Sequence, residues 1–376
     1  MENSDGRQGF TKGLKIMSNR KGIAFMFLVF MATALKPTVF AQSSVFAGYT
    51  STIHQNINHL LKDGKTGLYF ETTDAVQKEN PHSWLWPLCA LVQAANEMEV
   101  LSGKQEYLKP VRKAIDQYYS DLSPVAYQDY VTAERLSSRF YDDNQWIAIA
   151  YLDAYNRTLE AEYLKKAMMI YDYMITGIDE KAGGGLYWKE GDFSTKNTCS
   201  NAPAILVALQ LYKITKEKKY MEMALSVYDW TNKTLRAPEG LFYDAIKIPG
   251  GEIDRKFYTY NSGAMLQANA LLFGITGNQK YLTAAQQISK AAKSYFFKDK
   301  RLPGHYWFNA VLLRGSIELY HIDKNPDWID IFRNEAQRIW DEERDEANLL
   351  GQRKEKTLID QAAMMEIYAR LTQLEK

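Results

Sequence analysis

Residues 144–174 read NQWIAIAYLDAYNRTLEAEYLKKAMMIYDYM and contain two different helical patterns in succession. The first part, NQWIAIAYLDAYNRTL, is apolar on nearly all sides, which is typical of a helix buried inside a protein. The second part, EAEYLKKAMMIYDYM, places apolar residues at helical spacing beside a charged face, which is typical of a surface helix. The connection between them is short, so the stretch predicts a hairpin of one inner and one outer helix.

This hairpin recurs along the chain. Five outer-type runs share an aromatic anchor, and successive anchors lie 47 to 61 residues apart: Tyr107, Tyr163, Tyr220, Tyr281 and Trp328. An inner-type run precedes each of them, a sixth closes the chain at 358–374, and YTSTIHQNINHLLKD near residue 49 supplies an opening helix. Repeats of this length with two helices each are typical of stacked or closed helical arrays.

Twelve helices of these two kinds can form an open solenoid or a closed ring. Open arrays need polar repeats that cap their ends, whereas the final run, LIDQAAMMEIYARLTQL, is apolar over much of its surface. Packing against the first repeat would bury that surface, so we predict an all-α fold, an (α/α)6 barrel or toroid of six inner and six outer helices. No linker-like segment divides residues 42–376, which we expect to form a single domain.

The connections between the predicted helices alternate in length. Those from inner to outer helices are short, and those from outer to inner helices are long, so all the long loops must lie at one end of the ring. Functional sites are often built on such loops. One of them, SSRFYDD at 137–143, ends with Asp142 and Asp143 at the start of an inner run. Helix capping and catalysis by two carboxyl groups both explain this pair, and its position at the loop end favours catalysis.

The N-terminus has the features of a signal peptide. A basic segment precedes an apolar stretch and a small-residue cleavage site ending at Ala41, so we expect residues 1–41 to be removed, with Met17 as a candidate initiator. Lys36 and Pro37 interrupt the apolar stretch before it reaches the roughly 20 residues that a membrane helix needs. We therefore predict an extracytoplasmic protein, periplasmic or secreted, without stable membrane insertion.

The composition argues against several classes of partner. The 46 basic and 45 acidic residues give a formal net charge of +1, which provides no general attraction for nucleic acid. The histidines and the two cysteines, Cys89 and Cys199, show no metal-ligand spacing, so we predict no metal and no cofactor. Whether the cysteines pair stays open. Aromatic residues form 13% of the chain, an excess that suits stacking against sugar rings.

Three motifs in order give a specific resemblance: YDDNQW at 141–146, GGGLYWKEGDFSTKNTCSNAPAIL at 183–206, and YTYNSGAMLQANALLFGITGNQKYL at 258–282. Over roughly residues 130–300 the chain resembles glycoside hydrolase family 76, the bacterial and fungal α-1,6-mannanases. The resemblance implies an (α/α)6 catalytic domain over 42–376 and a retaining endo-hydrolase of α-1,6-linked mannan backbones. Its partner would be a polysaccharide or oligosaccharide substrate, and we expect a monomer.

By motif, the resemblance makes Asp142 the nucleophile and Asp143 the general acid/base. A retaining mechanism needs one ionised carboxylate and one protonated carboxyl group, about 5 to 5.5 Å apart, on either side of the glycosidic bond. Adjacent residues of a helix point about 100° apart, so the two side chains can flank one bond. Two close carboxyl groups also repel each other's second negative charge, which raises the pKa of one group and leaves that of the other low. The order within the pair is implied by the family alone.

Aromatic and polar residues near the motifs are candidates for substrate binding: Arg139, Tyr187, Trp188, Asn197, Asn201, Tyr258, Tyr260, Asn261 and Trp307. Rings of this kind stack on sugars, and amide or guanidinium groups bind hydroxyls. Helix capping and core packing compete with this interpretation for the asparagines and tyrosines. The chain has Ser262 where the family is expected to have glutamine, a difference that concerns a binding contact and not the catalytic pair.

Two other functions remain open. A different glycosidase on the same fold, such as an unsaturated-uronyl hydrolase, would need cations for the substrate carboxylate, and the long loops contain Lys189, Lys196, Arg255 and Lys256. A non-catalytic glycan-binding protein would use the same cleft, but the presence of both Asp142 and Asp143 argues against it.

Overall fold

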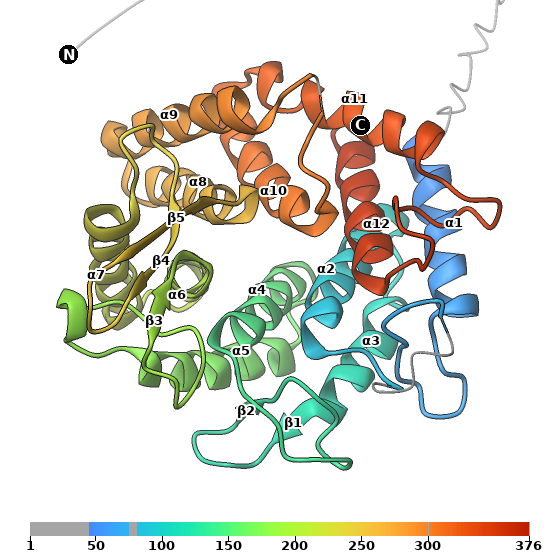
Figure 1. The fold of residues 1–376 in the computed structure, drawn as a ribbon, viewed down its shortest axis with the longest axis horizontal. Helices are drawn as coiled ribbons and strands as arrows, with labels where there is room; N and C mark the ends of the chain where they lie inside the picture. Colours follow the sequence, from blue (N-terminus) through green and yellow to red (C-terminus); the bar gives the residue numbers. More distant parts are fainter. Residues whose placement is uncertain (1–44, 75–80, 300, 376) are drawn as a thin grey trace, which may run out of the picture. The chain divides into compact units, whose positions relative to one another are not determined.

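Six inner helices follow one another around a closed ring in the computed structural model (Figure 1). Each packs against the next, and the last packs against the first. Their bounds are α2 (Leu85–Ser102), α4 (Tyr141–Thr158), α6 (Thr198–Thr215), α8 (Thr259–Thr276), α10 (Tyr306–Asp323) and α12 (Leu358–Gln373). The structure describes residues 45–74, 81–299 and 301–375, and the predicted signal peptide lies outside these ranges.

Six outer helices surround the inner ring: α1 (Val45–Leu60), α3 (Leu108–Ile115), α5 (Ala161–Met174), α7 (Lys218–Leu235), α9 (Gln279–Phe296) and α11 (Asp330–Glu342). The first of them, α1, packs against α12, so the two ends of the helical array meet. This closure buries the apolar surface of the final helix, and the predicted (α/α)6 barrel is confirmed. No helix within the described ranges is long and apolar enough to span a bilayer.

Burial separates the two kinds of helix as the sequence patterns predict. In α6 every residue from Thr198 to Leu211 is buried, because the helix has neighbours on all sides. In α11 the buried residues are Phe332, Glu335, Ala336, Ile339 and Trp340, which recur at helical spacing along one face. The remaining residues of α11 are half-buried or exposed.

Two glycines allow a very close approach of α8 and α10. A Cβ atom on Gly263 would lie 2.6 Å from the Cα of Leu312, and one on Gly315 would lie 2.5 Å from the carbonyl oxygen of Gly263. No side chain fits between the helices at these positions. The pair of glycines therefore fixes the distance between two of the inner helices.

The long connections all lead into the first turns of inner helices, as predicted, and they contain short strands and 3₁₀ helices that the all-α prediction did not include. Two strands pair before α4, β1 (Tyr119–Ser120) and β2 (Ala126–Tyr127), and three form an antiparallel sheet in the order β3 (Thr195–Asn197), β4 (Tyr243–Lys247), β5 (Ile253–Phe257). The 3₁₀ helices of these connections, within the described ranges, are Asp116–Tyr118, Ile175–Gly177 and Lys181–Gly183, and a further one, Pro326–Trp328, lies in the short connection between α10 and α11. The three-stranded sheet joins the loops before α6 and α8 at the same end of the ring.

A repeated polar contact ties the loops to the inner helices. In three inner helices, a buried amide side chain of the first turn makes a paired contact with one loop residue: Asn144, Asn201 and Gln361. Each amide accepts a hydrogen bond from the N–H of one loop residue and donates one to its carbonyl oxygen, at 2.8 to 3.0 Å; the loop residues are Tyr127, Leu186 and Leu350 respectively. These contacts hold the long loops against the end of the ring.

Candidate active site

Asp142 and Asp143 lie at a cavity of about 610 Å³ at the loop end of the ring. Nine aromatic residues line this cavity: Trp84, Trp86, Phe140, Trp146, Trp188, Tyr258, Tyr260, Trp307 and Phe308. The other lining residues are Asp129, Asp142, Asp143, Asn197, Cys199 and Asp244. A mostly aromatic wall with a few carboxyl groups is typical of a small-molecule or carbohydrate site.

The two aspartates lie within the first turn of α4 and do not act as its N-cap. The N-cap residue is Phe140, and its side chain makes no capping hydrogen bond. Asp142 accepts a hydrogen bond from the N–H of Asp143 at 3.1 Å through Oδ1. Its Oδ2 accepts a second one from Nε1 of Trp188, also at 3.1 Å. Helix capping therefore does not explain the pair.

The two carboxyl groups have different surroundings. Burial raises the pKa of Asp142 to about 6, while hydrogen bonds from Cys199 and Trp188 favour its ionised form. Burial also raises the pKa of Asp143, well above its ordinary value, and the negative charges of Asp142 and Asp129 raise it further. Asp142 is thus the first of the two to ionise, and Asp143 keeps its proton.

Both cysteines lie beside the pair, and both are free and buried. Cys199 lines the cavity next to Asp142, and the thiol of Cys89 donates a hydrogen bond to the carbonyl oxygen of Asp143 at 3.2 Å. Burial raises the pKa of each thiol well above its ordinary value, so neither is a reactive thiolate.

Two further carboxyl groups at the cavity were missed from the sequence. Asp129 comes from the loop before α4, and Asp244 is carried by β4. Neither has another acidic residue or a motif directly beside it in the sequence, so only the general rule that long loops carry sites points to either of them. The pairing of β4 with β3 and β5 places Asp244 at the cavity.

Several buried polar atoms of the cavity residues have no hydrogen-bond partner within the described protein. They are Oδ1 of Asp129, Oδ1 of Asn197 and Nε1 of Trp307. Buried polar groups are normally paired, so a donor and two acceptors are left for a ligand or for water. A polyhydroxylated ligand can supply both kinds of partner.

Five of the predicted substrate-binding residues line the cavity: Trp188, Asn197, Tyr258, Tyr260 and Trp307. The other four lie behind it. Arg139 binds both carboxylate oxygens of Glu190 at 2.6 Å and the carbonyl oxygens of Leu122 and Pro124, so four of the five N–H groups of its guanidinium have partners in the protein. Arg139 therefore supports the loops and does not line the cavity.

The remaining three residues behind the cavity also have protein partners. The hydroxyl of Tyr187 donates a hydrogen bond to Asp179 at 2.8 Å. Asn201 binds the backbone of Leu186, as described above. Nδ2 of Asn261 donates to Asp244 at 3.2 Å, so Asn261 orients a cavity carboxylate without lining the cavity itself. Ser262, at the position that differs from the family expectation, accepts a hydrogen bond from the N–H of Phe242 and is buried.

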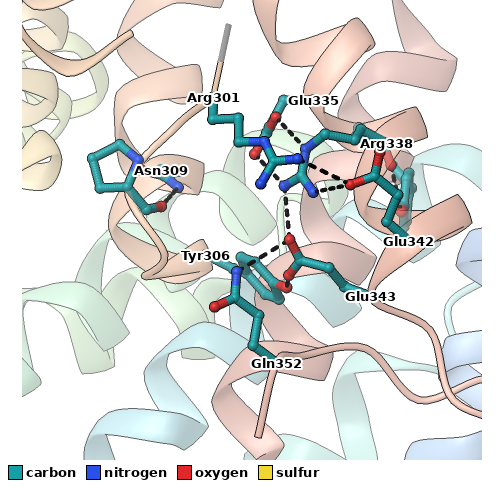
Figure 2. A network of polar contacts seen from close by, with 11 residues as sticks. Arg301, Tyr306, Asn309, Glu335, Arg338, Glu342, Glu343 and Gln352 are labelled. Carbon is teal, nitrogen blue, oxygen red and sulfur yellow. Dashed lines mark hydrogen bonds and ion pairs between the residues drawn. The ribbon is translucent and has the colours of Figure 1, made fainter. Parts of the chain in front are cut away.

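A network of charged groups fixes the start of α10, which carries Trp307 and Phe308 into the cavity (Figure 2). Arg338 of α11 binds the carboxylates of Glu335, Glu342 and Glu343 at 2.7 to 3.0 Å. The hydroxyl of Tyr306 donates to Glu343, and Gln352 donates to the same carboxylate. The aromatic wall is thereby anchored to an outer helix and to the last long loop.

Known proteins resemble this chain in sequence and in structure. The family model described as glycosyl hydrolase family 76 matches residues 47–304. A mannan endo-1,6-alpha-mannosidase of Candida glabrata is 27% identical over 184 residues, which are 45% of this chain and 41% of that protein. The chain therefore spans less than half the length of this relative.

Two solved structures from Bacteroides thetaiotaomicron are similar over most of the chain. A family 76 glycoside hydrolase from a bovine strain has 28% identity and a TM-score of 0.82, covering 89% of this chain and 78% of that one. A family 76 mannosidase has 28% identity and a TM-score of 0.81, covering 88% of this chain and 99% of that one. Because the family model extends from α1 to the loop before α10, more than half of the sequence, this chain belongs to glycosyl hydrolase family 76.

Proposed function

We propose that this protein is a retaining endo-α-1,6-mannanase that cleaves the backbone of α-mannan. Membership of the family supports glycoside hydrolysis, and relatives named mannan endo-1,6-alpha-mannosidases support the substrate. One observation carries the mechanism: adjacent carboxyl groups share a cavity, and their surroundings favour ionisation of Asp142 and protonation of Asp143.

In the proposed reaction the Asp142 carboxylate attacks the anomeric carbon while Asp143 gives its proton to the leaving glycosidic oxygen. The glycosidic C–O bond breaks and a glycosyl ester of Asp142 forms. Asp143, now ionised, takes a proton from water, whose oxygen attacks the same carbon and releases Asp142. Two inversions give net retention. The hydrogen bond from Trp188 orients the nucleophile and favours its charged form.

The lining of the cavity supports a neutral sugar over a uronide. No lysine or arginine lines it within the described part of the chain. Lys196 is buried against Asp179, and Lys256 pairs with Asp254 at 3.5 Å. Without a cation at the site, a substrate carboxylate would meet four aspartates and lose its hydration without compensation.

Digestion of unbranched α-1,6-mannan tests the proposal. We expect the wild-type protein to release short mannooligosaccharides early, as an endo-acting enzyme does, and Asp142→Asn and Asp143→Asn to lose several orders of magnitude in rate. Asp229→Asn, which changes an exposed aspartate of α7, is the matched control and should retain activity. Release of mannose alone would point to exo action, and binding of mannan without any product would support a glycan-binding protein.

Azide separates the roles of the two aspartates. With an activated α-mannosyl substrate, azide should restore turnover of Asp143→Ala and give the α-mannosyl azide, because the glycosyl ester of Asp142 still forms. With Asp142→Gly it should give the β-mannosyl azide by direct displacement. The opposite pattern of products would exchange the two roles.

An extracytoplasmic location and a monomeric state are also part of the proposal. The predicted signal peptide at residues 1–41 supports the location. N-terminal sequencing of protein from the periplasm and the medium tests cleavage after Ala41, and sedimentation tests the monomer.

A further inference from the structure

Lys196 of β3 is a charged side chain with no exposed surface. Its ammonium lies 2.6 Å from Oδ1 of Asp179 and contacts three carbonyl oxygens, those of Asp179 at 3.1 Å, Lys181 at 2.8 Å and Gly184 at 2.6 Å. The ring of Tyr187 lies 4.7 Å from the same nitrogen. A buried ammonium is costly unless it is surrounded by oxygen atoms in this way. The Lys196 ammonium thus lies in a cage of four oxygen atoms.

The oxygen atoms of this cage come from one short loop, residues 179–184. The hydroxyl of Tyr187 closes the loop by donating to Asp179 at 2.8 Å. On the other side, Nε1 of Trp230 donates to the carbonyl oxygen of Ala182 at 2.9 Å. A Cβ atom on Gly185 would lie 2.5 Å from the Trp230 ring, so the backbone itself packs on the indole. The loop is therefore held by three side chains: Lys196 through the four oxygen atoms, Tyr187 through Asp179, and Trp230 through Ala182 and Gly185.

This loop leads directly to the residue that contacts the candidate nucleophile. Trp188 follows Tyr187, and its indole donates to Asp142 at 3.1 Å. The Trp188 side chain is 40% exposed, so burial alone does not fix its position. Its backbone is held instead, since its carbonyl oxygen accepts from Tyr141 at 3.1 Å and its N–H donates to Thr195 at 3.4 Å. Thr195 and Lys196 are consecutive, so β3 holds both sides of the loop.

We propose that Lys196 is a positioning residue for the reaction: its ammonium organises the loop at 179–188 so that Trp188 donates its hydrogen bond to Asp142. The expected effect on the reaction rests on the proposed function, whereas the expected effect on the hydrogen bond from Trp188 to Asp142 does not. A hydrogen bond to a carboxylate stabilises the ionised form. Without the cage, the indole loses its orientation, Asp142 binds a proton more tightly, and the nucleophile becomes protonated at a higher pH.

The kinetic test is a double-mutant cycle with α-1,6-mannan as substrate. It compares the pH at which kcat/KM falls on the acidic side of its optimum, the acidic limb of the profile. Trp188→Phe removes the indole N–H, and we expect it to move this limb upward by about one pH unit. Lys196→Met should move the limb in the same direction. If Lys196 acts through Trp188, the double variant should move it no further than Trp188→Phe alone. Additive shifts, or an unchanged limb in Lys196→Met, would overturn the proposal.

Two further variants complete the test: one controls for the loss of a lysine, and the other is used if Lys196→Met does not fold. Lys166→Met is the matched control, because Lys166 is a partly buried lysine paired with Asp116 at 2.6 Å on an outer helix, and it should leave the limb unchanged. If Lys196→Met does not fold, Asp179→Asn replaces it in the test. This change removes the negative charge beside the Lys196 ammonium at a side chain that is partly exposed. Asp179→Asn should then move the limb upward by a smaller amount, and an unmoved limb in this variant contradicts the proposal.

A measurement without substrate separates this inference from the proposed function. In protein labelled with ¹⁵N at the indoles of its 8 tryptophans, the resonance absent from Trp188→Phe belongs to Trp188. Its shift should titrate with pH in the wild type, lose that titration in Asp142→Asn, and titrate at a higher pH or not at all in Lys196→Met. An identical titration in wild type and Lys196→Met would refute the inference, whether or not the protein cuts mannan.

Discussion

Asp142 and Asp143 share one helical turn, and the difference between them arises from their neighbours. Trp188 and Cys199 stabilise the charged form of Asp142, whereas Asp129 adds a negative charge near Asp143. In the proposed reaction the active form has Asp142 ionised and Asp143 protonated, so kcat/KM should fall on both sides of an optimum. The acidic limb reports the first ionisation of the pair and the alkaline limb the second.

Asp129 offers a direct test of this arrangement. Its negative charge raises the pKa of Asp143, so Asp129→Asn should lower that pKa. Asp143 would then lose its proton at a lower pH, and the alkaline limb should move downward by roughly half to one pH unit. Asp244→Asn removes a cavity carboxylate that is not among the causes of the Asp143 shift and serves as the control. An unmoved alkaline limb in Asp129→Asn would show that Asp129 does not influence the acid.

The sequence could point to the proposed catalytic pair because a motif marks it, but it could not separate residues that line the cavity from residues that lie behind it. Asn197 and Asn201 both lie at the start of an inner run. Asn197 is the last residue of β3 and lines the cavity, whereas Asn201 lies one turn inside α6 and binds the backbone of Leu186. Asp129 and Asp244 reach the cavity only through contacts between distant loops, which no local pattern encodes.

At the scale of the helix, the contact between α8 and α10 depends on the absence of a side chain. A Cβ atom at Gly315 would meet the carbonyl oxygen of Gly263 at 2.5 Å, and backbone cannot move aside as a flexible side chain can. We expect Gly315→Ala to lower the free energy of unfolding by about 2 to 4 kcal/mol, although alanine is the better helix former. Urea denaturation measures the difference.

Gly274 provides the matched control for this prediction. It lies in α8 as well, is exposed, and has no atom within 4 Å of the place where a Cβ would stand. Gly274→Ala should therefore raise the free energy of unfolding by up to about 1 kcal/mol, following helix propensity alone. If both substitutions stabilised the protein, the close approach of the helices would be wrong.

All the inner helices except α12 are followed directly by a left-handed residue, and not all of these residues are glycine. Leu159 follows α4 with φ 61° and is 73% exposed, so its side chain contributes little packing. Leu159→Gly should stabilise the protein by about 0.5 to 1 kcal/mol, because glycine adopts this conformation without strain. The reverse change at the equivalent position of α8, Gly277→Ala, should destabilise it by a similar amount, since nothing obstructs a Cβ there. Equal thermal midpoints for all three proteins would contradict this explanation.

The helical elements could be predicted because burial on all sides or on one side leaves a pattern in the sequence. The three-stranded sheet could not, since its strands contain three to five residues and pair across two different loops. The amide contacts of Asn144, Asn201 and Gln361 are likewise invisible in any one repeat. They become a pattern only when the helix starts are aligned in space.

At the scale of the whole molecule, closure of the ring is accompanied by a polar network at the end opposite the loops. Arg314 of α10 binds Glu366 of α12 at 2.6 Å, and Arg370 of α12 binds Glu97 of α2 at 2.8 Å. Asp153 of α4 accepts a hydrogen bond from Gln93 of α2 at 3.1 Å. These groups connect four inner helices across the seam where the chain ends meet. The network leaves Asp153 as a carboxyl group without an ion pair within the described residues.

This surplus carboxyl group makes the stability of the ring dependent on pH. Burial raises the pKa of Asp153 to about 7, whereas an unfolded aspartate titrates near ~3.9. Between these values the folded protein holds a proton that the unfolded chain has lost, so the contribution of Asp153 to stability is largest at low pH and declines until the pH passes 7. Asp153→Asn removes this decline and should gain on the order of 2 kcal/mol relative to wild type between pH 5 and pH 8.

Thermal unfolding of both proteins across this range measures that gain. The contributions of Asp142 and Asp143, whose pKa values are also raised, occur in both proteins and cancel in the difference. Asp172→Asn, at an exposed position of α5, should parallel the wild type. If the wild-type and Asp153→Asn curves stay parallel from pH 5 to pH 8, Asp153 is ionised throughout, and the network accommodates its charge without a proton.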